Sequence, residues 1–396
     1  MAISLTTRPA YPPFKHVEPT KEDLPFIKLG VVDLSRYVEG PEGVQSRKAL
    51  AADLEEAVRT QGFFFLEGHG YSPDKLDYLQ AVSQAVLDLP LEEKTEFSAG
   101  AQSSEGDSLA DATKFGAERG TGYKPRGYWS MQNGVRDQIE HYNLRNLLYP
   151  TVRESQQYPP LVRQHLPDFV DYISYLHYHV IPKLCTLFDI ILELPEGTFW
   201  NLCSINPDRP EESAGFARAM LYNPMPEEDE KKTANTWLRG HSDASYLTFI
   251  TSQPMASLQV RDYTDGQWKW VGYRPNSLVV NTADTLEFLT GAYFKSTIHR
   301  VVSPPKDQRD HRRLGVIYFS AFKPNVIVDP STLNSPKLNR LGITKPESWE
   351  SITAREWEDR KVKTFGKRDI NDVEGDEPVP FYIAGRTAER WHQLGK

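Results

Sequence analysis

The chain has 396 residues, enough for one large domain or two ordinary ones with a sizeable core. Apolar residues make up 39% and charged residues 25%, which excludes a disordered chain and is ordinary for a globular enzyme. The formal net charge is −8, and no block of five or six like charges occurs. Nucleic acid is therefore not expected as a partner, because phosphate binding requires a basic stripe. No apolar stretch is long and uninterrupted enough to predict a membrane span.

Two cysteines, Cys185 and Cys203, are too few for a disulfide framework. Both lie in or near an apolar helical segment, so we expect buried thiols in a reducing compartment. Residues 1–23 are rich in proline and lack the apolar segment of a signal peptide, which predicts an arm along the surface. These features favour a cytoplasmic enzyme, and they indicate no oligomeric state.

The first half of the chain, residues 24–213, shows mainly helical patterns with a few strands. Residues 26–35 predict a short strand that ends at a helix-capping region. Residues 46–62 carry apolar side chains at helical spacing and end at Gly62, where a helix would stop. A buried strand and a turn follow over residues 63–70.

Two longer stretches complete this half. Residues 98–120 are small, polar and without a period, which predicts a mobile loop that could act as a lid. Residues 158–194 form the longest helical pattern, which is predicted to break near Pro182 because proline removes a backbone donor.

The pattern changes at about residue 214 to short strands separated by Gly, Pro, Asn and Asp turns. Strands spaced this closely predict a jelly-roll. We therefore expect an α+β fold, a double-stranded β-helix core with a helical N-terminal region packed around it. The expected organisation is an arm (1–23), a helical region (24–213), the jelly-roll core (214–325) and a C-terminal extension (326–396). No linker separates these parts, which predicts one packed unit.

The stretch "GHSDASYLTFI", residues 240–250, places two metal-binding side chains in front of an apolar run. Residues i and i+2 of a strand point to the same face, so His241 and Asp243 could chelate one ion. His299 lies in another strand pattern, which a jelly roll could bring alongside. Two imidazoles and one carboxylate leave three positions of an octahedral metal open, as Fe(II) requires for O₂ and a co-substrate. The H-x-D tripeptide alone is common by chance, so the hypothesis depends on the late histidine and a basic residue beyond it.

Such a basic residue precedes the apolar strand "LGVIYFSAF". Strand alternation places Arg313 and Gly315 on one face, and Arg312 and Leu314 on the other. An arginine at the mouth of an apolar strand needs an anion, and its planar fork suits a carboxylate. A dicarboxylate such as 2-oxoglutarate could chelate iron at one end and reach Arg313 with the other. The alternative is a surface ion pair, which we expect for one of the two arginines.

Over residues 24–325 the sequence resembles the 2-oxoglutarate/Fe(II)-dependent oxygenases, in their isopenicillin N synthase-like branch. The resemblance rests on the order and spacing of "IKLGVVDLSRY", "LEEAVRTQGFFFLEGHGYS", "LYNPMP", "GHSDASYLTFI", "STIHRVVSP" and "RRLGVIYF". It implies that His241, Asp243 and His299 bind Fe(II), with 2-oxoglutarate as co-substrate and O₂ as oxidant. It implies no catalytic residue beyond these ligands.

The resemblance also implies a co-substrate pocket. Arg313 would bind the distal carboxylate of 2-oxoglutarate, and the Tyr222 hydroxyl would bind the same molecule. The family usually has Arg-x-Ser in this strand, but Gly315 replaces the serine. One hydrogen bond to the co-substrate is therefore missing or supplied by Tyr222 or water.

The implied activity is hydroxylation, desaturation or ring formation on a small, partly apolar organic molecule, by analogy of fold in secondary metabolism. Tyr246, Phe319 and His141 are candidates to line its pocket, although each residue type is more often plain core. One alternative is an O₂-dependent oxidase of the same fold that does not use 2-oxoglutarate and tolerates the loss of Arg313. Others are a jelly-roll binding protein with a closed structural metal, and a demethylase of proteins or nucleic acids, which would require a charged groove.

Overall fold

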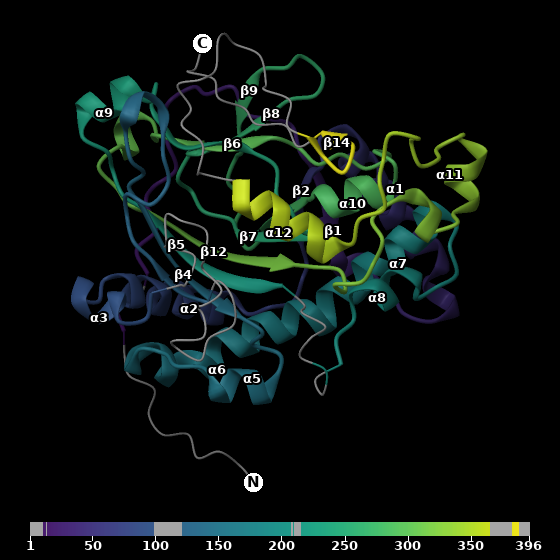
Figure 1. Ribbon diagram of the computed structural model, residues 1–396, viewed down its shortest axis with the longest axis horizontal. Coiled ribbons are helices and arrows are strands. Elements are labelled where there is room, and N and C mark those ends of the chain that lie inside the picture. Colours follow the sequence, from purple (N-terminus) through teal and green to yellow (C-terminus); the bar gives the residue numbers. More distant parts are fainter. Residues whose placement is uncertain are drawn as a thin grey trace.

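Two facing sheets form the centre of the molecule in the computed structural model (Figure 1). It describes residues 11–12, 14–98, 121–206, 209, 215–364 and 382–387. The larger sheet has eight strands in the order β1-β2-β10-β7-β12-β5-β4-β3, and the smaller has four in the order β6-β11-β8-β9. Most neighbours in these sheets are distant in sequence, which confirms the predicted double-stranded β-helix. The predicted loop at 98–120 lies outside the described residues, apart from Ser98.

The strands are short, as their close spacing in the sequence predicts. They are β1 (Gly30–Asp33), β2 (Phe63–Glu67), β3 (Gly122–Lys124), β4 (Ile139–Arg145), β5 (Phe216–Tyr222), β6 (Thr236–His241), β7 (Leu247–Thr251), β8 (Leu258–Arg261), β9 (Trp268–Trp270), β10 (Leu278–Thr282), β11 (His299–Val302), β12 (Arg313–Ser320), β13 (Tyr382–Ile383) and β14 (Arg386–Thr387). The first four strands belong to the N-terminal half, and two of them, β2 and β4, pair with β10 and β5 of the C-terminal half in one sheet. The two halves are therefore packed together, whereas the domain boundaries given above stay a prediction.

Helices cover the larger sheet on its outer face (Figure 1). The described residues also include helices that lie elsewhere, such as α9 beside the smaller sheet. The helices are α1 (Val44–Thr60), α2 (Pro73–Leu87), α3 (Leu91–Thr95), α5 (Pro150–Ser155), α6 (Pro160–Tyr175), α7 (Ile181–Leu192), α8 (Thr198–Cys203), α9 (Glu227–Lys232), α10 (Asp284–Leu289), α11 (Pro336–Arg340) and α12 (Ala354–Thr364). Of these, α2 packs directly against β4, β5 and β12. No helix in the described part of the chain is both long and apolar enough to cross a membrane.

The first predicted elements form as their sequence indicates. Strand β1 ends at Asp33, whose carboxylate accepts from the Ser35 N–H and caps a short 3₁₀ turn. After α1 the chain turns at Gly62, which has a φ of +63°. A Cβ there would lie 2.1 Å from the Lys295 carbonyl oxygen, so only glycine fits. This turn leads the chain from α1 into β2.

The long helical pattern breaks where Pro182 predicts, and the break takes the form of a π turn. Residues 176–180 separate α6 from α7, and the Ile181 N–H donates to the Leu176 carbonyl, five residues earlier. Pro182 lies in the first turn of α7, where the missing N–H costs nothing. The extra residue of the π turn moves the earlier carbonyls away from the proline ring.

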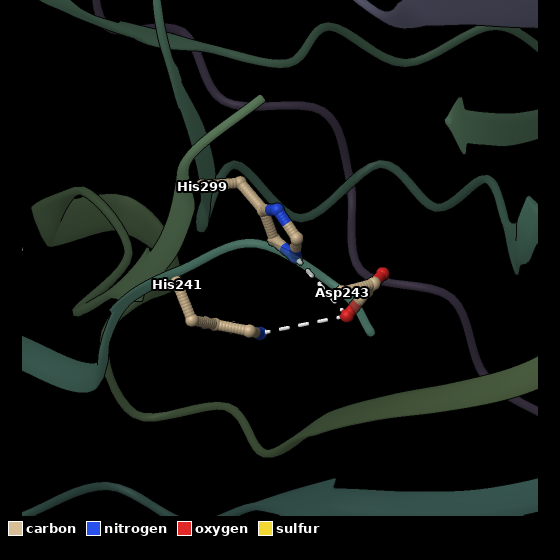
Figure 2. A group of neighbouring side chains, drawn as sticks. All are labelled: His241, Asp243 and His299. Carbon is tan, nitrogen blue, oxygen red and sulfur yellow. Dashed lines mark ion pairs between the residues drawn. The ribbon is translucent and has the colours of Figure 1, made fainter. Parts of the chain in front are cut away.

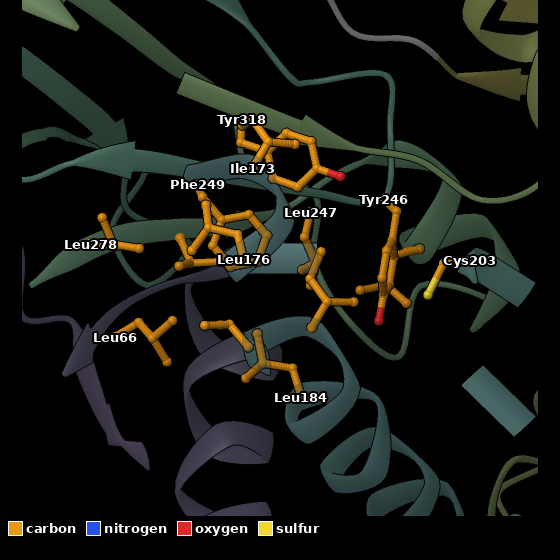
Figure 3. Close-up of a cluster of buried hydrophobic side chains, with 14 of the residues drawn as sticks. Leu66, Ile173, Leu176, Leu184, Cys203, Tyr246, Leu247, Phe249, Leu278 and Tyr318 are labelled. Atoms are coloured by element: carbon orange, nitrogen blue, oxygen red, sulfur yellow. The ribbon is translucent and has the colours of Figure 1, made fainter. Parts of the chain in front are cut away.

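Alternate residues of the larger sheet belong to two different cores. The outer core lies between this sheet and the helices, and Figure 3 shows part of it, with Leu247 and Phe249 of β7 above the helix that carries Leu184. The inner core lies between the two sheets and includes Tyr222 and Ile317. The inner face of the larger sheet is therefore the wall that looks toward the smaller sheet.

The two cysteines are buried and free, as predicted. Their sulfur atoms lie 3.6 Å apart in the outer core, where Cys185 also contacts the Tyr246 hydroxyl. Burial, and then Cys185, raise the pKa of the Cys203 thiol well above its ordinary value. The Cys203 thiol is therefore protonated and unreactive at neutral pH.

Candidate metal and co-substrate site

Three predicted ligands meet at the edge of the smaller sheet. His241, the last residue of β6, lies directly opposite His299, the first residue of β11. Their rings have centroids 4.3 Å apart. The Asp243 Oδ1 atom lies 3.8 Å from Nε2 of His241 and 3.9 Å from Nε2 of His299 (Figure 2). One potential ligand atom from each residue lies within 4.8 Å of the other two, close enough to share one ion.

The reason predicted for this convergence is wrong. Strand β6 ends at His241, and Asp243 lies in the turn before β7, so strand alternation does not place the two side chains on one face. Tertiary hydrogen bonds position the carboxylate instead. Its Oδ2 accepts from Thr248 Oγ1 at 2.7 Å and from Asn281 Nδ2 at 2.9 Å. Oδ1 is thereby turned toward the two histidines.

Each histidine is also held by its second ring nitrogen. The Nδ1 of His241 donates to the Arg239 carbonyl at 2.9 Å, and the Nδ1 of His299 donates to the Thr297 carbonyl at 3.1 Å. A carbonyl only accepts, so Nδ1 carries the proton in each ring, and Nε2 is the nitrogen left to bind a metal. These Nε2 atoms face Asp243, which is the arrangement that a metal ion requires.

The ionisation of the site agrees with metal binding. Burial, and then the neighbouring His299, lower the pKa of His241 to about 3, so this ring is neutral at physiological pH. Burial alone would raise the pKa of Asp243, but His299, His241 and the hydrogen bonds from Asn281 and Thr248 hold it below its ordinary value. Two neutral imidazoles and one carboxylate are the donor set of a non-haem Fe(II) site with open positions.

A second part of the candidate site lies around Arg313, the first residue of β12. Arg313 is 4% exposed and lies opposite Tyr222 of β5, with its guanidinium 5.0 Å from the tyrosine ring. Burial lowers the pKa of Arg313, with Tyr222 opposing the effect. Its Nε has no hydrogen-bond partner, and no carboxylate within the described residues pairs with it. A buried guanidinium is costly without an anion, so the position fits a carboxylate ligand.

Arg312 points away from this pocket, as alternation predicts. Its guanidinium lies outside the sheet and pairs with Asp88 of the α2 end, at 2.5 Å and 3.2 Å. The Asp88 carboxylate has a lowered pKa because the bonds and charge of Arg312 outweigh the effect of burial. Of the two arginines, Arg312 is the surface ion pair and Arg313 is the inward-facing residue.

Gly315 and Tyr222 border the space next to Arg313. A Cβ built on Gly315 would lie 3.7 Å from Ile317 and 3.9 Å from Nη1 of Arg313, which is ordinary contact. The Tyr222 hydroxyl donates only to the Met220 sulfur, at 3.3 Å. Because a thioether is a weak acceptor, this hydroxyl can turn to a better one when an anion binds.

The predicted substrate residues separate into two layers. Tyr246 is wrong as a pocket residue, because it is fully buried in the outer core (Figure 3). Its ring stacks on that of Phe322, with centroids 4.3 Å apart. His141 and Phe319 do lie on the inner face, because His141 lies directly opposite Met220 and Phe319 directly opposite Phe216 in the sheet. Burial, and then Arg218 and Lys124, lower the pKa of His141 well below its ordinary value, so it is neutral.

Sequence reasoning missed two cations close to the site. Arg218 lies on the inner face of β5, a position that alternation from Tyr222 would have shown. Lys361 of α12 donates to the Ser242 hydroxyl at 2.7 Å and pairs with Asp284, so the C-terminal extension braces the turn between His241 and Asp243. No local pattern reveals the second contact, because Lys361 is 119 residues from Ser242.

Two family models match this chain, each over a different part. The family model of the 2OG-Fe(II) oxygenase superfamily matches residues 213–321. A second model, for the N-terminal part of the non-haem dioxygenases in morphine synthesis, matches residues 29–163. The two matches fall on the two halves that the sequence distinguishes, and the first contains all three predicted metal ligands.

Curated relatives and solved structures agree with these matches. Jasmonate-induced oxygenase 3 of Arabidopsis thaliana is 26% identical over 84% of this chain and 83% of its own. A 1-aminocyclopropane-1-carboxylate oxidase of Dictyostelium mucoroides is 23% identical over 91% of this chain and 98% of its own. The crystal structure of Neurospora crassa T7H in complex with alpha-KG has a TM-score of 0.66 and 19% identity, covering 87% of this chain and 100% of that one.

Proposed function

The chain belongs to the 2-oxoglutarate/Fe(II) oxygenase superfamily, and we propose that His241, Asp243 and His299 bind its Fe(II) while Arg313 and Tyr222 bind 2-oxoglutarate. On this proposal the protein is a dioxygenase that oxidises a small organic molecule. The observation that carries the proposal is the pairing of two features between the two facing sheets. Three ligand atoms converge at one end, and a buried guanidinium without a carboxylate partner lies at the other.

The chain's own residues account for binding and orientation. When bound, Fe(II), 2-oxoglutarate and O₂ together supply an oxidant for C–H bonds. Asp243 and the two histidines leave one face of the metal open, and their second hydrogen bonds fix that face toward the interior. Arg313 fixes the far carboxylate of 2-oxoglutarate through its planar fork, and the apolar inner core around Ile317 excludes water from the reacting end.

A second candidate is an O₂-dependent oxidase of the same fold, which the Dictyostelium relative favours by its name. Such an enzyme has no need of a buried arginine opposite Tyr222. The buried, unpaired Nε of Arg313 therefore supports 2-oxoglutarate as the co-substrate. We also propose a cytoplasmic location, supported by two free thiols that lie 3.6 Å apart without forming a disulfide.

Product analysis tests the proposed function. The purified protein is supplied with Fe(II), ascorbate, 2-oxoglutarate and air, and O₂ uptake is recorded beside succinate release. We expect slow succinate release even without a substrate, in step with O₂ uptake, and its loss in Asp243→Ala. O₂ uptake without succinate would favour the oxidase, and neither signal would contradict both candidates.

A further inference from the structure

A second arginine on the inner face, Arg218, has no carboxylate partner in the part of the chain that the structure describes. Its Nε donates to the Asn143 amide oxygen at 2.8 Å, and its guanidinium lies 5.3 Å from the Phe216 ring and 5.2 Å from the Phe319 ring. These partners carry no negative charge. Burial lowers the pKa of Arg218 to about 10, so the side chain remains a cation at neutral pH.

Other cations within the fold are compensated in several ways. Lys124 pairs with Asp137 at 2.7 Å, and Lys94 pairs with Glu140 at 2.6 Å. Arg386 donates to three backbone carbonyl oxygens, which is the pattern of a structural arginine.

Arg300 has neutral surroundings like those of Arg218. Its Nε donates to the Gln259 amide oxygen at 2.8 Å, and its guanidinium lies 4.3 Å from the Trp268 ring, but the side chain is buried. Arg218 differs from Arg300 because it is partly exposed and the negative charge of Asp243 acts on it. A ligand held beside Asp243 can therefore reach the Arg218 guanidinium.

The aromatic pair beside Arg218 is placed next to the metal ligands. Phe216 and Phe319 stack with centroids 4.6 Å apart and an angle of 24° between their planes. Phe319 lies opposite Thr248 in the sheet, and Thr248 is the residue whose hydroxyl holds Asp243. Directly opposite residues have Cβ atoms about 5 Å apart, so the ring pair forms the wall beside the metal centre.

Solvent reaches this part of the inner face. Along β5 and β12, Phe216, Arg218 and Phe319 are partly exposed, although they point between the two sheets. The other residues of these two strands are buried. These accessible side chains lie at the end of β12 opposite to Arg313, where a ligand can reach the inner face from solvent.

A nearby carboxylate belongs to a different arginine. The Arg145 guanidinium lies 4.2 Å from the Phe216 ring, and its charge acts on the half-buried Glu358 of α12. Burial raises the pKa of Glu358 to about 7, with Arg145 as the first group that opposes the rise. The negative charge that acts on Arg218 is that of Asp243, the proposed metal ligand. This electrostatic contact places Arg218 close to the metal centre.

We infer that the substrate is an organic anion, with a carboxylate that pairs with Arg218 and a planar or apolar body that lies against Phe216 and Phe319. This inference rests on the proposed function, because the anion would be held beside the Fe(II) that His241 and its partners bind. A guanidinium pairs with a carboxylate through two parallel hydrogen bonds and so fixes its orientation. Arg218 is thus a specificity-determining residue, distinct from Arg313, which binds the co-substrate.

Binding of matched acids and amides tests this inference. Cinnamate, 1-naphthoate and 3-phenylpropanoate are titrated calorimetrically into the anaerobic protein with Fe(II), each beside its primary amide. Saturating 2-oxoglutarate keeps the acids out of the Arg313 site. We expect at least one acid to bind the wild type tenfold or more tightly than its amide, since a charge-assisted pair contributes about 1.5–3 kcal/mol.

Two variants and one control locate the effect. Arg218→Met should reduce the preference for acid over amide to less than about threefold, and Arg218→Lys should retain part of it because the charge stays. Arg312→Met, on the outer face of β12, should leave the preference unchanged. The 2-oxoglutarate affinity of Arg218→Met should match the wild type, which shows that the co-substrate pocket is intact.

The other outcomes of these titrations would each overturn one part of the inference. Equal binding of acids and amides, or binding of neither, would overturn the anionic substrate class. A preference that survives Arg218→Met would overturn the role of this residue. The visible absorption of Fe(II) with 2-oxoglutarate is recorded in the same samples. Its absence from the wild type would overturn the proposed function itself, whereas its presence without an acid preference would overturn this inference alone.

Discussion

The two faces of strands β4, β5 and β12 have opposite chemistry, although they belong to the same backbone. The outer face packs apolar side chains against the helices, namely Tyr142, Leu144, Ala217, Ala219, Leu221, Leu314, Val316 and Tyr318. The inner face carries polar or charged groups among its apolar ones, namely His141, Asn143, Arg218, Tyr222 and Arg313. Alternation thus separates residues that stabilise the fold from residues that we propose to bind ligands, one position apart.

Substitutions at neighbouring positions of these strands should therefore change different properties of the protein. Burial of an apolar side chain on the outer face contributes about 25 cal/mol per Å² removed from water. An inner guanidinium such as Arg313 opposes folding until an anion reaches it, because a buried charge is costly when unpaired. Changes to the outer face should therefore alter the free energy of unfolding, and changes to the inner face should alter ligand affinity.

The largest effect is expected at the metal ligands. His241→Ala, Asp243→Ala or His299→Ala should each abolish succinate release, because two ligands do not form the three-coordinate face that Fe(II) needs. The fold should survive in all three variants. Circular dichroism, which reports the content of helices and strands, checks this expectation. Wild-type-like O₂ consumption in two of the three purified variants would refute the assignment.

The next effect compares two adjacent arginines on opposite faces. Arg313→Met should weaken 2-oxoglutarate binding by roughly tenfold to a thousandfold, the loss of a two-point contact worth about 1.5–4 kcal/mol. Arg312→Met should change the affinity little, because its partner is Asp88 outside the sheet. Anaerobic titration of both variants decides between them, and the reverse ranking would show that the two side chains have exchanged roles.

A third comparison uses the neighbours Leu221 and Tyr222 on β5. Leu221→Ala should lower the free energy of unfolding by about 2–5 kcal/mol, because it leaves a cavity in the outer core. Its 2-oxoglutarate affinity should stay within about twofold of the wild type. Tyr222→Phe should do the opposite, weakening 2-oxoglutarate by about tenfold through the loss of one hydrogen bond to a charged group.

Chemical denaturation beside co-substrate titration checks this third pair. The control is the double variant. Additive effects would show that the two faces are independent even though the two residues are adjacent, because neighbouring sites ordinarily couple. If Leu221→Ala weakened the co-substrate as strongly as Tyr222→Phe, the two faces would be coupled and their separation would be contradicted.

The smallest effect is expected at Gly315. A Cβ there makes only ordinary contacts, the nearest at 3.7 Å, so Gly315→Ser fits without displacing backbone. Its hydroxyl should tighten 2-oxoglutarate by a few fold or leave the affinity unchanged, if an ordered water already supplies the bond. A tenfold weakening in the measured dissociation constant would mean that the glycine provides required space.

The sequence predicted those parts of the structure that local chemistry decides. Short strands between turn residues indicated the jelly roll, and alternation alone separated Arg313 from Arg312. The location of the helix break followed from the fixed geometry of Pro182. The proposed metal ligands could be predicted because histidine and aspartate close together at the end of a strand indicate a metal site by their chemistry. That indication holds even though the backbone conformation expected at Asp243 was wrong.

Contacts between distant segments were beyond the reach of the sequence. Asp243 is held in a turn by Asn281 across the sheet, so the strand expected there was wrong. The face of Tyr246 was ambiguous because all residues of β7 are buried and the period-two signal is absent. Arg218 could be assigned to the inner face by counting from Tyr222, but its lack of an acidic partner required the structure.

The central claim is that one site joins the three ligands to Arg313 and binds one Fe(II) with one 2-oxoglutarate. Anaerobic titration of both into the purified protein tests it most directly. We predict a weak visible absorption that saturates at one equivalent of Fe(II) and one of 2-oxoglutarate, and that is lost in Asp243→Ala. In Arg313→Met the absorption should require at least tenfold more 2-oxoglutarate, as expected when about 1.4 kcal/mol or more of binding free energy is removed. No absorption in the wild type, or an equal absorption in Asp243→Ala, would contradict the account.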